Sequence, residues 1–419
     1  MFKNRDAFLK NIIIVFSGNF LANFLNLLFQ LLIAHKLSPT DFAAYNSLLS
    51  IFMLVFLPLG TLQYVLAKYC AEYKALGQDF KLTFLITDFI RKAFILAMFL
   101  FVIFWFSSGS ILNALKINSP ASGYLLTAVI ALSCLIPVFL GGIQGLELFG
   151  RLSLVVVIAG IFKLVIAYVF IVLGFRIAGA LGALLISYAV NLSIFYFFLR
   201  HFISFKAEKV YINYKEISGY ALPVALSSFC FIALVNMDMI LVKHFFTPQE
   251  AGVYSLSQMV GKIFLFLPSA ISIVMFPRVS GLNASNSDTT RTLHRSLLYA
   301  LALCVIACLV YNLFPAFIIK ILTGKAFAES IALGRLFSFS MSLFALLFVL
   351  ITYFLSVKDL RFVKYLVLSA VLQFIGILLF HQNIFQVQAV LCGNAFFILV
   401  IFLFLMRKRT QAADNYEKP

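Results

Sequence analysis

The chain has 419 residues, of which 63% are hydrophobic and only 11% are charged. A soluble domain is about half apolar and about one quarter charged, so this composition excludes an ordinary soluble protein and predicts a polytopic membrane protein. The net charge of +17 would suggest nucleic acid as a partner of a soluble protein. In a membrane protein, positively charged cytoplasmic loops explain it first, and we expect no nucleic-acid partner.

Long apolar stretches follow one another along the whole chain. A membrane-spanning helix needs about 20 mainly apolar residues. By this criterion we predict an all-α membrane protein with about twelve transmembrane helices, six in each half. They cover residues 11–34, 42–67, 88–106, 122–144, 152–174, 178–199, 217–243, 253–277, 296–315, 333–355, 361–380 and 386–406.

Lys and Arg are distributed unevenly over the predicted loops. Most of the 32 fall on one side, together with both ends of the chain. Because positively charged loops stay in the cytoplasm, we predict that both termini are cytoplasmic and that these loops contact anionic membrane lipid. The loop 200–216 joins the halves. We therefore predict an amino-terminal six-helix bundle over 1–205, a carboxy-terminal six-helix bundle over 206–409 and a cytoplasmic tail over 410–419.

One segment occurs twice, as LIAHKLSPTDFAAY at 32–45 and as LVKHFFTPQEAGVY at 241–254. Four identities recur 209 positions apart: Leu32/Leu241, His35/His244, Pro39/Pro248 and Tyr45/Tyr254. In each copy Ser or Thr precedes proline and an acid follows in the next turn, which is the pattern of a helix start. Since the offset is half the chain and each half has an even number of spans, we predict two bundles related by a parallel internal repeat.

A lysine lies at the centre of the fifth predicted span. Lys163 is twelve residues after Arg151 and thirteen before Arg176. A charge at this depth costs about 2.5–3.5 kcal/mol on insertion scales, so we expect the side chain to face inward, toward water, a partner or a ligand. The alternative is a neutral lysine or one held by an intramembrane hydrogen bond.

Two further charges lie inside the spans of the second half. Lys262 is in the eighth span, with Gln258 one turn before it and Pro268 after it, where we expect a bend. We expect Lys262 to line a cavity. Asp238, in the seventh span, is the only clear acid within a span. We expect it to form a salt bridge, to Lys262 or Lys163, or to bind a coupling ion or substrate.

Four amides form a stripe in the first span. Asn19, Asn23, Asn26 and Gln30 are spaced by four, three and four residues, so they share one face of a helix. Amides that face lipid are costly, so this face must meet other helices or water. The stripe forms hydrogen bonds between helices, or it forms a polar wall that contacts sugar hydroxyls.

Sequence motifs of catalysis and metal binding are not found in the chain. The six cysteines are dispersed, and we find no phosphate-binding glycine loop, no catalytic triad spacing and no zinc motif. We expect no cofactor, no metal site and no enzyme activity.

Three stretches resemble a known family. They are LSPTDFAAYNSLLS after the first span, QGLELFGRLSLVVVIAGIFKL at 144–164, and the segment 236–280, which has an acid in span seven, Gly-x-Tyr-Ser after the turn and a proline late in span eight. In these motifs the sequence resembles the Wzx-type flippases. They are the polysaccharide-exporting branch of the multidrug/oligosaccharidyl-lipid/polysaccharide (MOP) exporter superfamily.

The resemblance implies a MATE-like fold, in which two bundles face each other across a cavity lined by spans one, two, seven and eight. It implies alternating-access transport of a polyprenyl-pyrophosphate-linked oligosaccharide, of O-antigen or capsule type, across the bacterial inner membrane. H⁺ or Na⁺ as coupling ion and a glycan polymerase as partner would follow. Two members of the same superfamily remain alternatives: a cation-coupled multidrug antiporter, which should carry acids in its first half, and a lipid II flippase, which should carry several arginines in its cavity.

Overall fold

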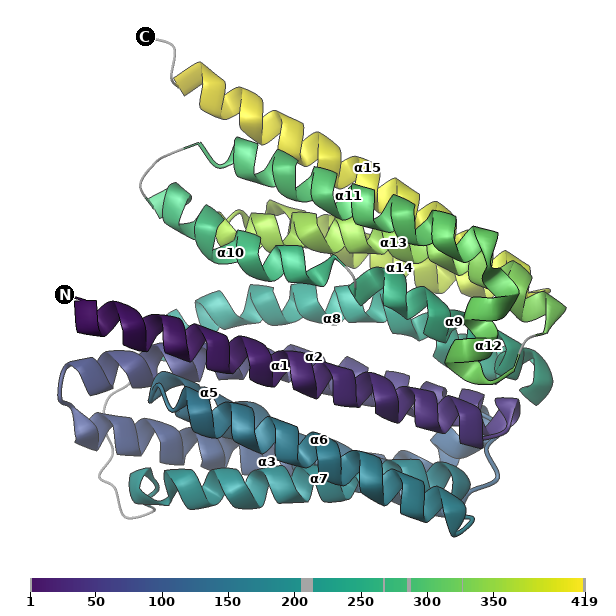
Figure 1. Ribbon diagram of the computed structural model, residues 1–419, viewed down its shortest axis with the longest axis horizontal. Coiled ribbons are helices and arrows are strands. Elements are labelled where there is room, and N and C mark those ends of the chain that lie inside the picture. The colour runs from purple at the N-terminus through teal and green to yellow at the C-terminus, as the bar shows by residue number, and fades with distance from the viewer. Residues whose placement is uncertain (1, 205–213, 267, 285–287, 326, 417–419) are drawn as a thin grey trace. The chain divides into compact units, whose positions relative to one another are not determined.

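The structure is a computed structural model that describes residues 2–204, 214–266, 268–284, 288–325 and 327–416. Within these residues all regular elements are helices, which confirms the predicted all-α fold (Figure 1). Those before the loop at 205–213 are α1 (Phe2–Lys36), α2 (Pro39–Ala75), α3 (Asp79–Ala114), α4 (Pro120–Ser133), α5 (Ile136–Gly145), α6 (Phe149–Val172), α7 (Arg176–Leu199) and the 3-10 helix η1 (Arg200–Phe202). Those after it are α8 (Tyr214–Phe245), α9 (Pro248–Phe266), α10 (Ser269–Ala284), α11 (Thr290–Leu313), α12 (Pro315–Thr323), α13 (Ala328–Ser356), η2 (Leu360–Phe362), α14 (Val363–Leu379) and α15 (Ile384–Tyr416).

The repeated segment starts a helix in both halves, as predicted. Helix α2 begins at Pro39, and the backbone N–H of Asp41 donates to the Oγ of Ser38 over 3.1 Å. Helix α9 begins at Pro248. There the backbone N–H of Glu250 donates to the hydroxyl of Thr247 over 3.3 Å, and the backbone N–H of Thr247 donates to the carboxylate of Glu250 over 3.0 Å. In each copy a hydroxyl residue before proline therefore satisfies backbone groups that the helix leaves open.

Proline divides two of the predicted spans. The eighth is divided into α9 and α10, with Pro268 between them, where the sequence predicted a bend. The fourth was predicted to be continuous, but it is divided into α4 and α5, with Pro137 in the first turn of α5. Proline lacks a backbone N–H and its ring displaces the carbonyl four residues earlier, which explains both breaks. Pro58 is nevertheless accommodated inside α2.

Ten helical segments in the described part of the chain are long and apolar enough to cross a membrane, when α4 and α5 are counted together as the segment Pro120–Gly145, so the protein is a multi-pass membrane protein. The first and eighth predicted spans are not among them. Of α1, only the stretch Phe20–Lys36 could be assessed as an apolar helix, and the eighth span is divided between the 19 residues of α9 and the 16 of α10. The number twelve and the cytoplasmic position of the termini stay predictions.

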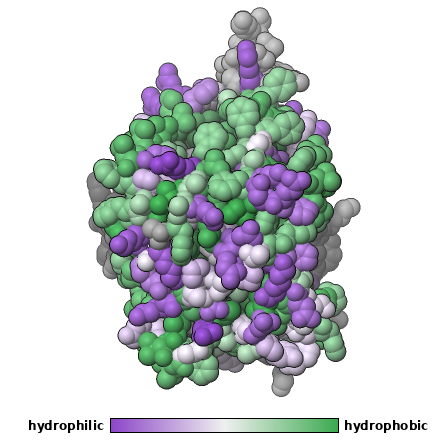
Figure 2. Space-filling model, turned by 90° about the vertical axis from the view of Figure 1, so that its right-hand side faces the viewer, coloured by the Kyte–Doolittle hydropathy of each residue, from purple (hydrophilic) through white to green (hydrophobic). Residues whose placement is uncertain are grey.

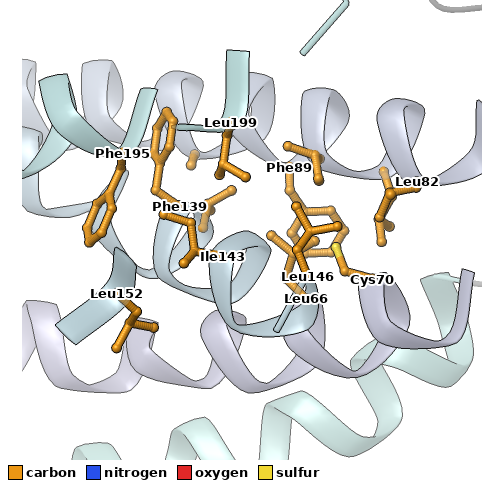
Figure 3. Packing of buried hydrophobic residues seen from close by; sticks show 14 of the residues in the cluster. Leu66, Cys70, Leu82, Phe89, Phe139, Ile143, Leu146, Leu152, Phe195 and Leu199 are labelled. Carbon is orange, nitrogen blue, oxygen red and sulfur yellow. The ribbon is translucent and has the colours of Figure 1, made fainter. Parts of the chain in front are cut away.

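The chain divides into two compact units, Met1–Ala225 and Leu226–Pro419. The domain boundary predicted at 205/206 lies outside the described residues and stays a prediction. In the first unit α1 packs on α6, and α2 packs on α5. Its core is a cluster of buried side chains from α2, α3, α5, α6 and α7, together with Leu146 between α5 and α6 (Figure 3). The labelled members include Leu66, Cys70, Phe89, Ile143, Phe195 and Leu199.

In the second unit α13 is the central helix, packed against α9, α10, α11 and α15. Its contact with α9 is close. The ring of Tyr254 meets Phe337 edge-on with 5.0 Å between ring centroids, and a Cβ added to Gly261 would lie 2.8 Å from the Cβ of Phe337. A glycine is required where two helices approach this closely, so the packing of α9 on α13 fixes how the polar side chains of α9 are presented.

Candidate functional site

In the first unit, the lysine of α6 and the amide stripe of α1 meet. The Nζ of Lys163 donates a hydrogen bond to the Oδ1 of Asn26. The same ammonium lies 4.6 Å from the centre of the Phe29 ring, a cation–π distance. Sequence reasoning named Lys163 and Asn26 separately, and the packing of α1 on α6 brings them together.

The remaining amides of the stripe differ in their surroundings. Gln30 donates from its Nε2 to the Oδ1 of Asn46 on α2 over 3.1 Å, so it forms a hydrogen bond between helices. Asn23 and Asn26 are exposed. The side chain of Asn19 lies outside those that the structure describes. One stripe therefore contains both an interhelical bond and accessible polar groups.

In the second unit, the acid of α8 is completely buried. Asp238 is 0% exposed, and its Oδ2 accepts two hydrogen bonds of 2.8 Å, from the hydroxyl of Tyr254 and from the Nε2 of Gln258. Its Oδ1 is buried without a hydrogen-bond partner among the described residues. One face of α9 thus supplies two donors to a carboxyl of α8, because Tyr254 and Gln258 lie one turn apart.

The second lysine reaches α8 beside this carboxyl. The Nζ of Lys262 donates to the Oδ1 of Asn236 over 2.9 Å, and the Nδ2 of Asn236 donates to the carbonyl of Ile232 over 3.1 Å. Between Lys262 and Asp238, both of which the structure describes, no ion pair is formed. Lys262 is thus held by an amide, and the predicted salt bridge between these two residues is not present.

Sequence reasoning missed several polar residues that take part in these contacts. Tyr254 and Asn236 bond directly to predicted residues. A second buried network lies nearby on α8: Gln373 of α14 donates to the carbonyl of Leu234 over 2.8 Å and accepts from Asn394 of α15 over 3.0 Å. Amides within apolar spans, the pattern that identified the stripe of α1, would also have identified Asn236, Gln373 and Asn394.

These groups can bind hydroxyls and anions. Ammonium and amide donors at Lys163 and on the exposed face of α1 suit hydroxyl oxygens and phosphate, whereas the carboxyl of Asp238 accepts hydrogen bonds inside the protein. Within the described residues no three His, Cys, Asp or Glu side chains come together as a metal site would require.

Several solved structures share the fold. The inward-facing structure of a multidrug resistance MATE family transporter of the MOP superfamily has a TM-score of 0.80 at 14% identity, with 97% of this chain and 99% of that chain covered. The outward-facing structure of such a transporter has a TM-score of 0.64 at 16% identity, covering 96% and 95%. The eukaryotic MATE transporter AtDTX14 has a TM-score of 0.59 at 14% identity, covering 96% and 99%. At these identities the likeness establishes the MATE fold.

Sequence comparison identifies the family. No curated protein resembles the chain closely enough in sequence to count as a relative. The family model described as polysaccharide biosynthesis protein matches residues 8–283, which is more than half of the chain. This match and the fold confirm the resemblance to Wzx-type flippases. The chain belongs to the polysaccharide biosynthesis protein family, and it has the MATE fold.

Proposed function

We propose that the protein is a flippase for polyprenyl-pyrophosphate-linked oligosaccharides, the repeat units of an O-antigen or capsule, in the bacterial inner membrane. It works by alternating access of its two helical bundles, 1–205 and 206–409, with both termini and the tail 410–419 in the cytoplasm. A glycan polymerase uses the exported unit, and H⁺ or Na⁺ supplies the energy. Membership of the polysaccharide biosynthesis family gives the general direction of this proposal.

The contact between Lys163 and the stripe carries the proposal. A pyrophosphate needs cations and a glycan needs hydrogen-bonding groups. Lys163 supplies an ammonium beside Asn26, with the exposed Asn23 one turn away on α1. An ammonium and amides on one surface suit an anionic, hydroxylated substrate better than a cationic drug. The same chemistry is compatible with lipid II, which also joins a pyrophosphate to a glycan.

The network of Asp238 supports a coupling role in the second unit. A buried carboxyl that is held by Tyr254 and Gln258, and that has one oxygen without a partner, can take up a proton or a sodium ion. Lys262 lies on the same face of α9, one turn after Gln258. Binding of a proton or a cation at Asp238 would therefore change the electrostatic potential at the Lys262 ammonium. We assign the substrate contact to Lys163 with its stripe, and the coupling to Asp238 with Lys262 and Gln258.

Deletion of the gene in its natural host tests the function. Surface polysaccharide and lipid-linked intermediates are measured together in the deletion strain and in the complemented strain. We expect surface polysaccharide to be lost and polyprenyl-linked oligosaccharide to accumulate on the cytoplasmic side. Normal polysaccharide with raised sensitivity to cationic dyes would contradict the proposal in favour of a drug antiporter. Accumulation of lipid II with cell lysis would contradict it in favour of a lipid II flippase.

A further inference from the structure

A pocket opens at one end of the first unit, where α1 meets α2 and α6 meets α7. Its volume is about 460 Å³. It is lined by Lys36, Leu37, Ser38, Asp41, Ile171, Gly174 and Arg176. Hydrophilic side chains are frequent on the face that contains the end of α1 (Figure 2). Since the pocket lies where membrane-spanning helices end, it lies at the level of lipid headgroups.

The charges of this pocket favour an anion. Lys36 and Arg176 contribute two cations from separate helices, and Asp41 contributes one carboxylate. In the described part of the chain, none of the three forms an ion pair with another side chain. Both cations are exposed, so they are available to a ligand. Arginine and lysine are the side chains that bind phosphate best, arginine through a planar fork and lysine as a point charge.

The second unit shows that the repeat does not require an open pocket here. Lys36 corresponds to Phe245 in the repeated segment, 209 positions later. Phe245 stacks on His381, which lies between α14 and α15, with 4.1 Å between ring centroids. Glu250, the counterpart of Asp41, accepts hydrogen bonds from the backbone and hydroxyl of Thr247. An aromatic stack thus occupies the end of α8 in the second unit, where the first unit places a lysine beside a cavity.

We propose that the pocket between Lys36 and Arg176 binds a phosphate-bearing group, the headgroup of an anionic membrane lipid or the pyrophosphate of a lipid-linked substrate. The cavity is large enough for such a group, and the two cations provide its charge complement. Asp41 weakens the binding and keeps it reversible. By the orientation predicted from the sequence, the pocket lies on the outer face, where a flipped lipid would leave. Binding itself depends on neither that orientation nor the proposed function.

Binding is tested on the purified full-length protein with two probes. The soluble probe is inorganic pyrophosphate, followed by calorimetric titration in neutral detergent. The lipid probe is phosphatidylglycerol, followed as lipid retained by the protein in native mass spectrometry against phosphatidylcholine. The variants are the double substitution Lys36→Gln with Arg176→Gln, the single substitution Asp41→Asn, and Lys320→Gln as control. Lys320 is an exposed lysine of α12 in the second unit, so its loss removes a positive charge far from the pocket in sequence.

We expect the double variant to lose about tenfold or more in affinity for at least one probe, because two charge-assisted contacts are removed. Asp41→Asn should raise affinity for the same probe, and Lys320→Gln should leave it unchanged. A response to the lipid alone identifies a headgroup site, and a response to pyrophosphate alone identifies a substrate site. Equal binding by wild type and double variant, or an equal loss in Lys320→Gln, would overturn the proposal. Since no export is measured, a failure of the flippase proposal leaves this result valid.

Discussion

Two corresponding tyrosines have opposite surroundings in the two units. Tyr254 of α9 donates its hydroxyl to Asp238 over 2.8 Å. Its counterpart Tyr45 in α2 meets Phe29 edge-on, with 6.5 Å between ring centroids, and its buried hydroxyl has no hydrogen-bond partner among the described residues. Phe29 and Asp238 are separated by the same 209 positions as the tyrosines. Both copies of the repeat therefore bury a tyrosine at this position. Its neighbour is an acid, Asp238, in the second unit and an aromatic ring, Phe29, in the first.

The other polar positions of the second unit follow the same rule. Gln258 and Lys262 correspond to Leu49 and Met53 at the same offset. Lys163 and Lys262 thus lie on helices that do not correspond, and their amide partners are Asn26 and Asn236. Two bundles that share a repeated segment can carry separate tasks in this way, which agrees with our assignment of substrate contact to one and coupling to the other.

The largest expected effect is on export, after loss of the cation of the first unit. Lys163→Ala should lower glycan export by about tenfold or more, because it removes a charge-assisted contact to the substrate phosphate. Export is measured as surface polysaccharide per amount of membrane-inserted protein. Lys364→Ala, which removes an exposed lysine of α14, serves as the control and should leave export unchanged. Export at the wild-type level in Lys163→Ala would remove this residue from the site.

The next largest effect is on the stability of the second unit. Asp238→Ala should lower the free energy of unfolding by about 2–4 kcal/mol, because the hydroxyl of Tyr254 and the amide of Gln258 lose their acceptor inside the protein. Unfolding of the purified protein in detergent measures this loss. Asp238→Asn keeps an acceptor oxygen and should lose less. If Asp238→Ala unfolds like wild type, the network does not stabilise the unit.

The third effect is on the close packing of α2 against α5, where an added methyl group should cost more stability than the loss of a single hydrogen bond. A Cβ added to Gly145 of α5 would lie 2.5 Å from the Cβ of Cys70 and 2.7 Å from the carbonyl oxygen of Ala67, both on α2. Gly145→Ala should therefore cost about 1–3 kcal/mol of stability. Gly150→Ala in α6 is the matched control, since nothing lies within 4 Å of its added Cβ. Equal stability of the two variants would show that α2 and α5 move apart without cost.

The smallest effect tests the tyrosine pair itself. Tyr254→Phe should cost about 1 kcal/mol of stability, the net value of a buried hydrogen bond. Tyr45→Phe removes a hydroxyl without a partner, so it should change stability little or raise it slightly. Both variants are measured by the same unfolding assay. A larger loss in Tyr45→Phe than in Tyr254→Phe would reverse the comparison between the units.

Much of the architecture could be predicted because it depends on local chemistry. Apolar stretches long enough for a bilayer predicted nearly every helix, and the Ser38–Pro39 and Thr247–Pro248 pairs predicted two helix starts. The sequence predicted the bend at Pro268 but not the break before Pro137. Pro58, which lies inside the continuous helix α2, shows that a proline does not always end a helix. Whether proline breaks a helix depends on what its neighbours provide for the freed carbonyl, which the sequence does not state.

The sequence by itself determined which residues are costly in a membrane: Lys163, Lys262, Asp238 and the amides of α1. It determined their cost because hydration and charge are properties of single side chains. Only the tertiary structure decided their partners. Lys163 reaches Asn26 from a helix 137 positions away, and Lys262 bonds to Asn236 instead of the neighbouring Asp238. Such pairings depend on how helices pack and on which side chains can come within about 3 Å, and this geometry is absent from a one-dimensional pattern.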